Sequence, residues 1–283
     1  MKQPHACSSL LASIFFMLPG SIGAQAPAPV PATDSLRIHL TDSPDWAPVK
    51  YELVQGDIVL RMTINGQPVS VLFDNGSART VVDQAFAARA GLPLGSSAQG
   101  LTTGKARLTT RHVEGLVVQL PHALTISGSL PAVNLASVST ALGRPIAAVL
   151  GGDVIARLAT FVRGDTRTIA IRPSGGFRIA GPVVTLPLVS TDQVEGEVAG
   201  KPVRLKVDFG FNGAVRLTDT AWRRAAAGMT AMPNSQINAD GVSHATNRIS
   251  TSIRLGQISA SAVPIDSGYS GLDVWSQGLM VRV

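Results

Sequence analysis

The chain has 283 residues and a formal net charge of +6, from 24 Lys and Arg against 18 Asp and Glu. Only 15% of the residues are charged and the arginines are scattered, which argues against a nucleic-acid-binding protein, because such proteins carry a basic patch or stripe. Aromatic residues are scarce while Val, Ile, Thr and Gly are abundant, so the composition predicts many short strands.

The first 24 residues predict an export signal. Lys2 precedes an apolar stretch over Ser8–Leu18, and small residues ending at Ala24 are typical of a cleavage site. A buried first helix is the alternative, but a Pro-Gly pair and the Ala/Pro-rich linker and N-terminal segment over 25–47 would break it. We therefore expect a periplasmic or secreted protein. The only cysteine, Cys7, would leave with the signal, so we expect no disulfide and no cysteine metal site in the mature chain.

The first structured part of the chain begins with a predicted β-hairpin. Strand-like residues run over Asp57–Thr63, Gly66-Gln67 makes the turn, and a return strand over Val69–Phe73 ends at Asp74. After the loop, a helix is predicted over Asp83–Gly91, because an Asp start cap, good helix formers and a Gly stop follow one another.

The rest of this unit is predicted from turn and strand signals. Leu101–Ala106 has the composition of an exposed hairpin tip, and Ser129–Pro145 is expected to be a surface excursion. A Gly-Xaa-Asp step within Val149–Ile155 closes the unit, and a last strand over Thr168–Ile171 follows. Gly and Pro interrupt that strand near Pro173–Gly176, where we place the boundary between two lobes.

The second half of the chain repeats these features. Val198–Val203 leads through an apolar run to Asp208, at an offset of 208 − 74 = 134 residues from the first Asp. A helix from Asp219, a hairpin tip at Asn238–Ser243 and a closing Gly-Xaa-Asp step within Tyr269–Trp275 follow in the same order. Each unit thus places one carboxylate at the end of a buried strand, and together they could supply the two halves of a paired-carboxylate site.

Paired carboxylates have a defined chemistry. Like charges a few ångströms apart do not both ionise cheaply, so the pair keeps one proton and its two apparent pKa values are pushed apart. One group is then a base and the other an acid. Taken alone, Asp74 fits a turn, because Asp-Asn-Gly is a common turn sequence. The repeat and the apolar strand before each Asp favour the paired site.

These segments resemble the retropepsin and pepsin group of aspartic peptidases, in the exported bacterial form with two retropepsin-like repeats in one chain. Val71–Val82 is similar to the family's apolar–Asp-Thr-Gly–small–Thr–apolar segment. Gly143–Pro145 with Val149–Gly151 is similar to the segment that threads behind the active-site loop. The resemblance runs from about Tyr51 to the C-terminus. It implies an all-β fold, mainly β with a few short helices, and a bilobal pepsin/retropepsin-like architecture with the active-site cleft between two related lobes.

The resemblance also implies an activity and a set of site residues. It predicts an aspartic endopeptidase in which Asp74 and Asp208 activate a water molecule that attacks a peptide bond, with no metal or other cofactor. The expected partner is a peptide or unfolded protein, and we expect a monomer with no nucleic acid and no stable membrane insertion. The lobes would span 48–176 and 177–283. The supporting residues implied are Asn75, Gly76, Ser77, Phe209 and Gly210 in the active-site loops, and Thr103, Gly104, Lys105, Asp240 and Gly241 in the flaps; Asp153 and Asp273 are expected to be structural.

The second unit departs from the family pattern. The Thr after the catalytic Asp is Asn75 in the first loop and Phe209 in the second, and the small residue after the Gly is Ser77 in the first but Phe211 in the second. Tyr269-Ser270 stands where the family has an apolar pair before the closing Gly. Three hypotheses therefore stay open: an active endopeptidase, a catalytically impaired peptide-binding protein with a vestigial second carboxylate, and a dimer in which two first units pair.

Other motifs in the chain lack the context that they need. Asp208-Phe209-Gly210 matches the kinase magnesium motif, but no Gly-rich loop and no His-Arg-Asp loop accompany it. The histidines do not have the His-Glu-Xaa-Xaa-His spacing of a zinc protease, and there is no Gly-Xaa-Ser-Xaa-Gly elbow. The sequence thus gives no support to a kinase, a zinc protease or a serine hydrolase.

Overall fold

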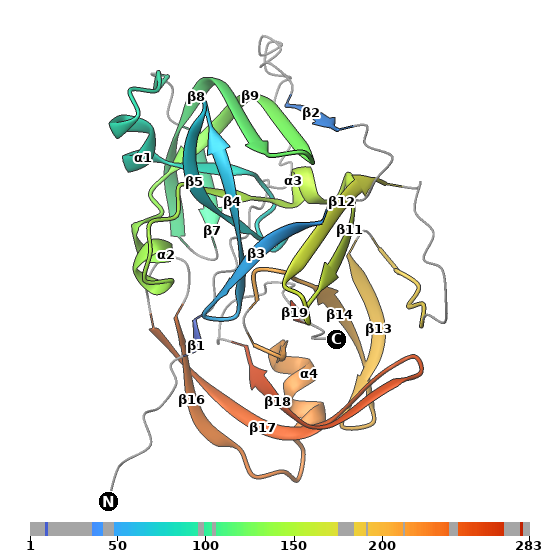
Figure 1. Ribbon diagram of the computed structural model, residues 1–283. Coiled ribbons are helices and arrows are strands. Elements are labelled where there is room, and N and C mark those ends of the chain that lie inside the picture. Colours follow the sequence, from blue (N-terminus) through green and yellow to red (C-terminus); the bar gives the residue numbers. More distant parts are fainter. Residues whose placement is uncertain are drawn as a thin grey trace, which may run out of the picture.

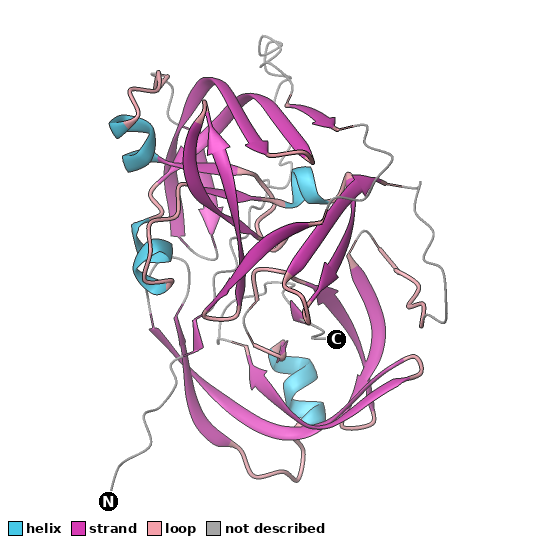
Figure 2. Ribbon diagram, viewed as in Figure 1, coloured by secondary structure: helices cyan, strands magenta, loops and turns pink. Residues whose placement is uncertain are grey.

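The computed structural model describes residues 9–10, 36–41, 48–95, 99–103, 106–174, 184–190, 192–211, 213–237, 243–268 and 278–279. Within this part of the chain strands make up 57% and helices 12% of the residues, with four short helices (Figure 2). The prediction of an all-β fold with a few short helices is confirmed. None of the helices described is long and apolar enough to cross a membrane.

The first lobe is an 11-stranded sheet folded around the larger apolar core. Its strand order is β11-β12-β3-β4-β5-β10-β6-β9-β8-β7, with β2 added beside β9 (Figure 1). Its strands are β2 (Arg37–Leu40), β3 (Val49–Val54), β4 (Asp57–Ile64), β5 (Gln67–Phe73), β6 (Val81–Asp83), β7 (Gln99–Thr103), β8 (Ala106–Leu120), β9 (Leu124–Val133), β10 (Ala148–Leu150), β11 (Leu158–Arg163) and β12 (Thr168–Pro173).

The second lobe is an 8-stranded sheet that curves around one helix; Figure 1 draws its strands in yellow to red, except the blue β1. Its strand order is β1-β16-β17-β13-β14-β19-β15-β18, and β17 also pairs with β18. Its strands are β1 (Ser9–Leu10), β13 (Gln193–Val198), β14 (Lys201–Val207), β15 (Val215–Leu217), β16 (Met232–Ile237), β17 (Ser243–Leu255), β18 (Ile258–Ser267) and β19 (Gly278–Leu279). Within the described residues the strands β2–β12 and β13–β19 thus fall into separate sheets; the predicted lobe limits themselves stay a prediction.

The predicted hairpin of each repeat is present, and both hairpins use the same turn. β4 and β5 pair antiparallel across Asn65 and Gly66, whose φ angles are 46° and 80°. β13 and β14 pair across Ala199 and Gly200, whose φ angles are 52° and 69°. Two consecutive residues with positive φ give the tight turn whose twist matches that of the paired strands. The first turn lies one residue earlier than predicted.

A short strand threads behind each active-site loop. In the first lobe β10 lies between β5, to which it is parallel, and β6, as the resemblance implies. In the second lobe β19 lies in the same way between β14 and β15, with Leu279 opposite Val207. In the described part of the second lobe the strand in this position is Gly278–Leu279. The predicted closing step within Tyr269–Trp275 lies outside the described residues and stays a prediction.

In the described part of the chain four helices lie between the strands: α1 (Gln84–Arg89), α2 (Ala136–Ala141), α3 (Gly152–Ile155) and α4 (Asp219–Ala225). Asp83 caps α1, since its carboxylate accepts the Phe86 backbone N–H at 2.8 Å, as its sequence predicts. Thr218, and not Asp219, caps α4; its hydroxyl accepts the Ala221 N–H at 3.4 Å, while Asp219 lies in the first turn.

The predicted surface excursion over residues 129–145 is wrong. Its first part continues β9 to Val133 inside the sheet, and its second part forms α2. Leu135, Val138 and Leu142 are buried in a small core together with residues of β4, β5 and β6. The apolar residues of this segment recur at a helical spacing, and this burial fixes the segment against the back of the first lobe.

Both predicted flap hairpins have their strands. β7 pairs with β8 and β16 pairs with β17. Thr103 is the last residue of β7. The flap residues Gly104, Lys105, Asp240 and Gly241 lie outside the described residues, so their predicted role stays a prediction.

Candidate active site

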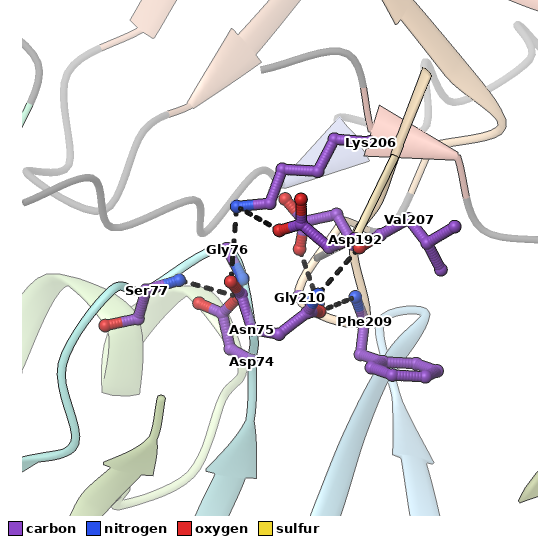
Figure 3. A network of polar contacts seen from close by, with 10 residues as sticks. Asp74, Asn75, Gly76, Ser77, Asp192, Lys206, Val207, Phe209 and Gly210 are labelled. Atoms are coloured by element: carbon purple, nitrogen blue, oxygen red, sulfur yellow. Dashed lines mark hydrogen bonds and ion pairs between the residues drawn. The ribbon is translucent and has the colours of Figure 1, made fainter. Parts of the chain in front are cut away.

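Asp74 lies at the end of β5, where a buried apolar run leads into the first loop. Its backbone N–H donates to the Leu150 carbonyl of β10 at 3.0 Å, which ties the loop to the strand behind it. Its Oδ1 accepts the backbone N–H groups of Gly76 at 2.8 Å and Ser77 at 3.2 Å (Figure 3). Its Oδ2 is buried and has no hydrogen-bond partner among the residues described.

Asp208 occupies the matching position at the end of β14. The Gly210 backbone N–H donates to its Oδ1 at 3.0 Å, as Gly76 does to Asp74. Both carboxyl groups are buried, with Asp74 at 0% and Asp208 at 1% exposed. The repeat in the sequence is thus a repeat of the local loop geometry.

The two loops meet at their glycines. A Cβ placed on Gly76 would lie 2.5 Å from Asp208 Oδ2 and 2.8 Å from Asp74 Oδ1, so this one point is close to both carboxyl groups. A Cβ placed on Gly210 would lie 2.1 Å from Asp74 Cγ. Real Cβ atoms do not come this close to other atoms, so each glycine is required by the carboxyl group of the opposite lobe. The structure brings the two predicted acids together.

Asn75 joins the two loops through its side-chain amide. Its Nδ2 donates to the Val207 carbonyl at 2.7 Å, and its Oδ1 accepts the Phe209 backbone N–H at 2.8 Å (Figure 3). The Phe209 ring packs toward the first lobe, with its centroid 5.3 Å from that of Phe73. One amide and one aromatic pair thus hold the loops, in place of the two threonine hydroxyls of the family pattern.

Lys206 adds a positive charge beside the loops. Its Nζ donates to the Asn75 carbonyl at 3.2 Å and lies 3.5 Å from the Asp192 carboxylate (Figure 3). The sequence analysis did not single out this residue, although the 134-residue offset places it where the first unit has the buried Leu72. A lysine at an otherwise apolar position of a repeat is the signal that could have found it.

Arg216 is a second cation of the second lobe that sequence reasoning missed. It is only 4% exposed, and its guanidinium lies 5.3 Å from the centre of the Phe211 ring. The Phe211 ring also covers Gly213, whose added Cβ would lie 2.6 Å from the end of the ring. Phe211 therefore packs within its own lobe against Arg216, and it does not fill the space where Gly76 meets the two carboxyl groups.

The surroundings of the two acids differ in charge. Burial raises the pKa of Asp74 well above its usual range, and repulsion from Asp208 and Asp57 raises it further. Burial also raises the pKa of Asp208. The charge of Lys206 lowers it, as do the hydrogen bond from the Gly210 N–H, the charge of Arg216 and a hydrogen bond with the Asp74 side chain. The pair titrates as a unit, and these neighbours favour the shared proton on Asp74 and the ionised form on Asp208.

Asp57, the first residue of β4, is a third acid near the pair. It is fully buried, and neither of its carboxyl oxygens has a hydrogen-bond partner within the described part of the chain. Burial raises its pKa well above the usual range, and repulsion from Asp208 raises it further. The sequence analysis placed Asp57 at a strand start and gave it no role.

Hydrogen bonds behind the first loop fix its shape. Asp153 accepts both the backbone N–H and the hydroxyl of Thr80, at 2.8 and 2.7 Å, and the Thr80 hydroxyl accepts the Gly151 N–H at 2.9 Å. Asp153 thus braces the loop, in keeping with a structural role, while Asp273 lies outside the described residues. The Ser77 hydroxyl donates to the Arg79 carbonyl at 2.7 Å, so Ser77 meets Asp74 through its backbone N–H only.

We also searched the described residues for a metal site and for hollows that include Asp74 or Asp208. No group of three or more His, Cys, Asp or Glu side chains within the described ranges is arranged to hold a metal ion. A hollow of about 980 Å³ lies on the first lobe between α1 and α2, and neither Asp74 nor Asp208 lines it.

A two-lobed β fold with one buried Asp-Gly loop from each lobe is the arrangement that the resemblance to retropepsin-like aspartic peptidases implies. Comparison with known proteins agrees: residues 60–154 match the family model described as aspartyl protease, and the predicted resemblance to this family is confirmed. That match covers the hairpin β4–β5, the first loop and the strand behind it.

Solved structures also match the chain. One is that of the EIAV protease complexed with the inhibitor HBY-793, with 18% sequence identity and a TM-score of 0.28, over 38% of this chain and 91% of that chain. No curated protein matches the chain. The assignment therefore rests on the family model and on the site geometry.

Proposed function

We propose that the protein is an aspartic endopeptidase that hydrolyses peptide bonds through Asp74 and Asp208. The observation that carries this proposal is the close approach at the glycines, where a Cβ placed on Gly76 would lie within 2.8 Å of oxygens of both carboxyl groups. The match of residues 60–154 to the aspartyl protease family supports a protease, and hence a peptide or unfolded protein as substrate.

The charges around the pair support an assignment of roles. Asp208, with Lys206 and Arg216 nearby, is the ionised base that takes a proton from a water molecule. The oxygen of that water attacks the peptide carbonyl carbon, and Asp74 gives its proton to the developing oxyanion. When the C–N bond breaks, Asp208 gives its proton to the leaving nitrogen and one hydroxyl group of the intermediate returns its proton to Asp74, so the pair again holds one proton. No cofactor takes part in these steps.

A catalytically impaired peptide-binding protein is the second candidate. It is favoured by Phe209, because a phenylalanine in place of the family's threonine cannot hydrogen-bond through its side chain. The described contacts weaken this argument, since the Asn75 amide bonds both Val207 and Phe209 across the interface. A binding protein would retain peptides without cleaving them.

A direct test uses the full chain, with Asp74→Asn and Asp208→Asn as variants. We expect the wild-type protein to cleave an unfolded protein at acid pH, and both variants to lose cleavage while keeping the far-UV circular dichroism spectrum of the wild type. Equal cleavage by Asp208→Asn would contradict the two-carboxylate mechanism. Tight retention of peptides without turnover from acid to neutral pH would support the binding protein instead.

We also propose that the protein is exported and acts as a monomer. The apolar N-terminal segment over Ser8–Leu18 supports the first point, and the presence of both acids in one chain supports the second. Sequencing the N-terminus of the protein recovered outside the cytoplasm tests the first. Activity that rises out of proportion to protein concentration would contradict the second.

A further inference from the structure

Asp57 lies on the same side of the sheet as Asp74. In the ladder between β4 and β5, Val59 is opposite Leu72, and both are buried in the same small core. Side chains alternate between the two faces of a strand, so the side chains two residues further along point to the same face. Continuing the register by two residues places Asp57 opposite Asp74. Side chains in such opposite positions have Cβ atoms about 4.5–5.5 Å apart.

Asp57 has no structural task that explains its burial. Other acids of the described chain that are largely buried each have a partner: Asp83 caps α1, Asp153 accepts from Thr80, and Asp266 pairs with Arg248. Neither oxygen of Asp57 has a partner among the described residues. A buried carboxyl group without a hydrogen bond is costly, and such groups are retained where function uses them.

The charges near Asp57 are of one sign. Repulsion from Asp208 raises its pKa, and no cation of the described chain lowers it. Asp192, near the pair in the second lobe, differs in this respect because it has Lys206 at 3.5 Å. Asp57 thus offers two carboxyl oxygens next to the dyad with no cation to neutralise them, whereas Asp192 has Lys206.

From this arrangement we infer that Asp57 is a specificity residue that binds a lysine or arginine side chain of the peptide next to the scissile bond. This inference rests on the proposed endopeptidase function. Asp57 and Asp74 share one face, so a peptide whose carbonyl reaches Asp74 also brings its neighbouring side chains to Asp57. A long cationic side chain satisfies both orphaned oxygens, and arginine does so with two parallel N–H groups. An apolar side chain would leave the carboxyl group unpaired.

The test compares peptides that differ at one residue. Quenched fluorescent peptides carry lysine, norleucine, arginine or citrulline on either side of a single cleavable bond, and kcat/KM is measured for the wild type and for Asp57→Asn. We expect the wild type to cleave each cationic peptide at least about tenfold faster than its neutral analogue, and Asp57→Asn to bring that ratio close to one. Asp165→Asn, which removes an exposed acid paired with Arg163 far from the dyad in sequence, is the control and should keep the wild-type ratio.

The ratio of kcat/KM for cationic and neutral peptides distinguishes a failure of this inference from a failure of the proposed function. If the wild type cleaves all four peptides equally, or if Asp57→Asn keeps the cationic preference, the inference is wrong while the endopeptidase stands. If no peptide is cleaved, the proposed function fails first, and binding then decides the role of Asp57. Calorimetry with the uncleavable Asp74→Asn background, with and without Asp57→Asn, should show tighter binding of the lysine than of the norleucine peptide only where Asp57 is present; equal binding would overturn the inference.

Discussion

Replacing Asn75 with alanine tests how the two lobes hold the acid pair. The variant removes both hydrogen bonds of the amide, so that the Val207 carbonyl and the Phe209 N–H lose their partners. A buried group left without a partner costs about 1–3 kcal/mol, and because both residues are only partly buried we expect about 2–4 kcal/mol for the two together. The loss acts between the lobes, since the donor and the acceptor come from the other repeat.

The expected result is a loss of both stability and activity. The free energy of unfolding from urea denaturation should fall by about 2–4 kcal/mol. The kcat/KM for a peptide should fall by about 100-fold, which is the usual effect of a shift of about 1 Å between reacting groups. The Lys206 contact with the Asn75 backbone carbonyl is kept in the variant, so the loss reports on the amide alone.

Two further variants make the result specific. Asn75→Asp keeps the acceptor for the Phe209 N–H but loses the donor to Val207, so it should be intermediate in stability. Asn134→Ala removes one exposed hydrogen bond to the Ala136 N–H and should leave activity unchanged. If Asn75→Ala keeps wild-type stability and kcat/KM, the amide does not hold the loops, and the reasoning is refuted.

Three more predictions follow from the same site. Lys206→Met removes a charge that lowers the pKa of Asp208, so the acid limb of the kcat/KM profile should move to higher pH, while Lys201→Met, at an exposed position, should leave it in place; an unmoved limb in both would contradict the assigned base. Gly210→Ala places a methyl group 2.1 Å from the opposite carboxyl group and should abolish cleavage and lower the melting temperature; an active, equally stable variant would mean that the carboxyl groups lie farther apart. Because the pKa of Asp57 is raised in the folded state, stability is lost as pH rises above the unfolded value of about 4, so Asp57→Asn should be more stable than the wild type at pH 7 and similar to it below about pH 4 in urea denaturation; equal stability at both would show that the pKa of Asp57 is not raised.

Much of the fold could be predicted because strand alternation, turn residues and helix caps are local sequence patterns. The β4–β5 hairpin follows from alternation around Asn65-Gly66, and the cap of α1 follows from Asp83. Where long-range pairing decides, local patterns fail. The segment that contains α2 has loop-like composition in part, but its apolar residues pack against the back of the first sheet. The last strand is selected by its place between β14 and β15 and carries no signature of its own.

The candidate active site also has features that the sequence determined and features that it did not. The 134-residue repeat by itself determined that two Asp-Gly loops exist and that Asp74 and Asp208 follow the return strands of two hairpins, because strand periodicity and turn chemistry are local. Only the tertiary structure decided what surrounds them. The Asn75 amide bridges to backbone groups more than 130 residues away, and Lys206 biases the proton toward the other lobe. Such contacts depend on how the two lobes face each other, and a one-dimensional pattern does not contain that orientation.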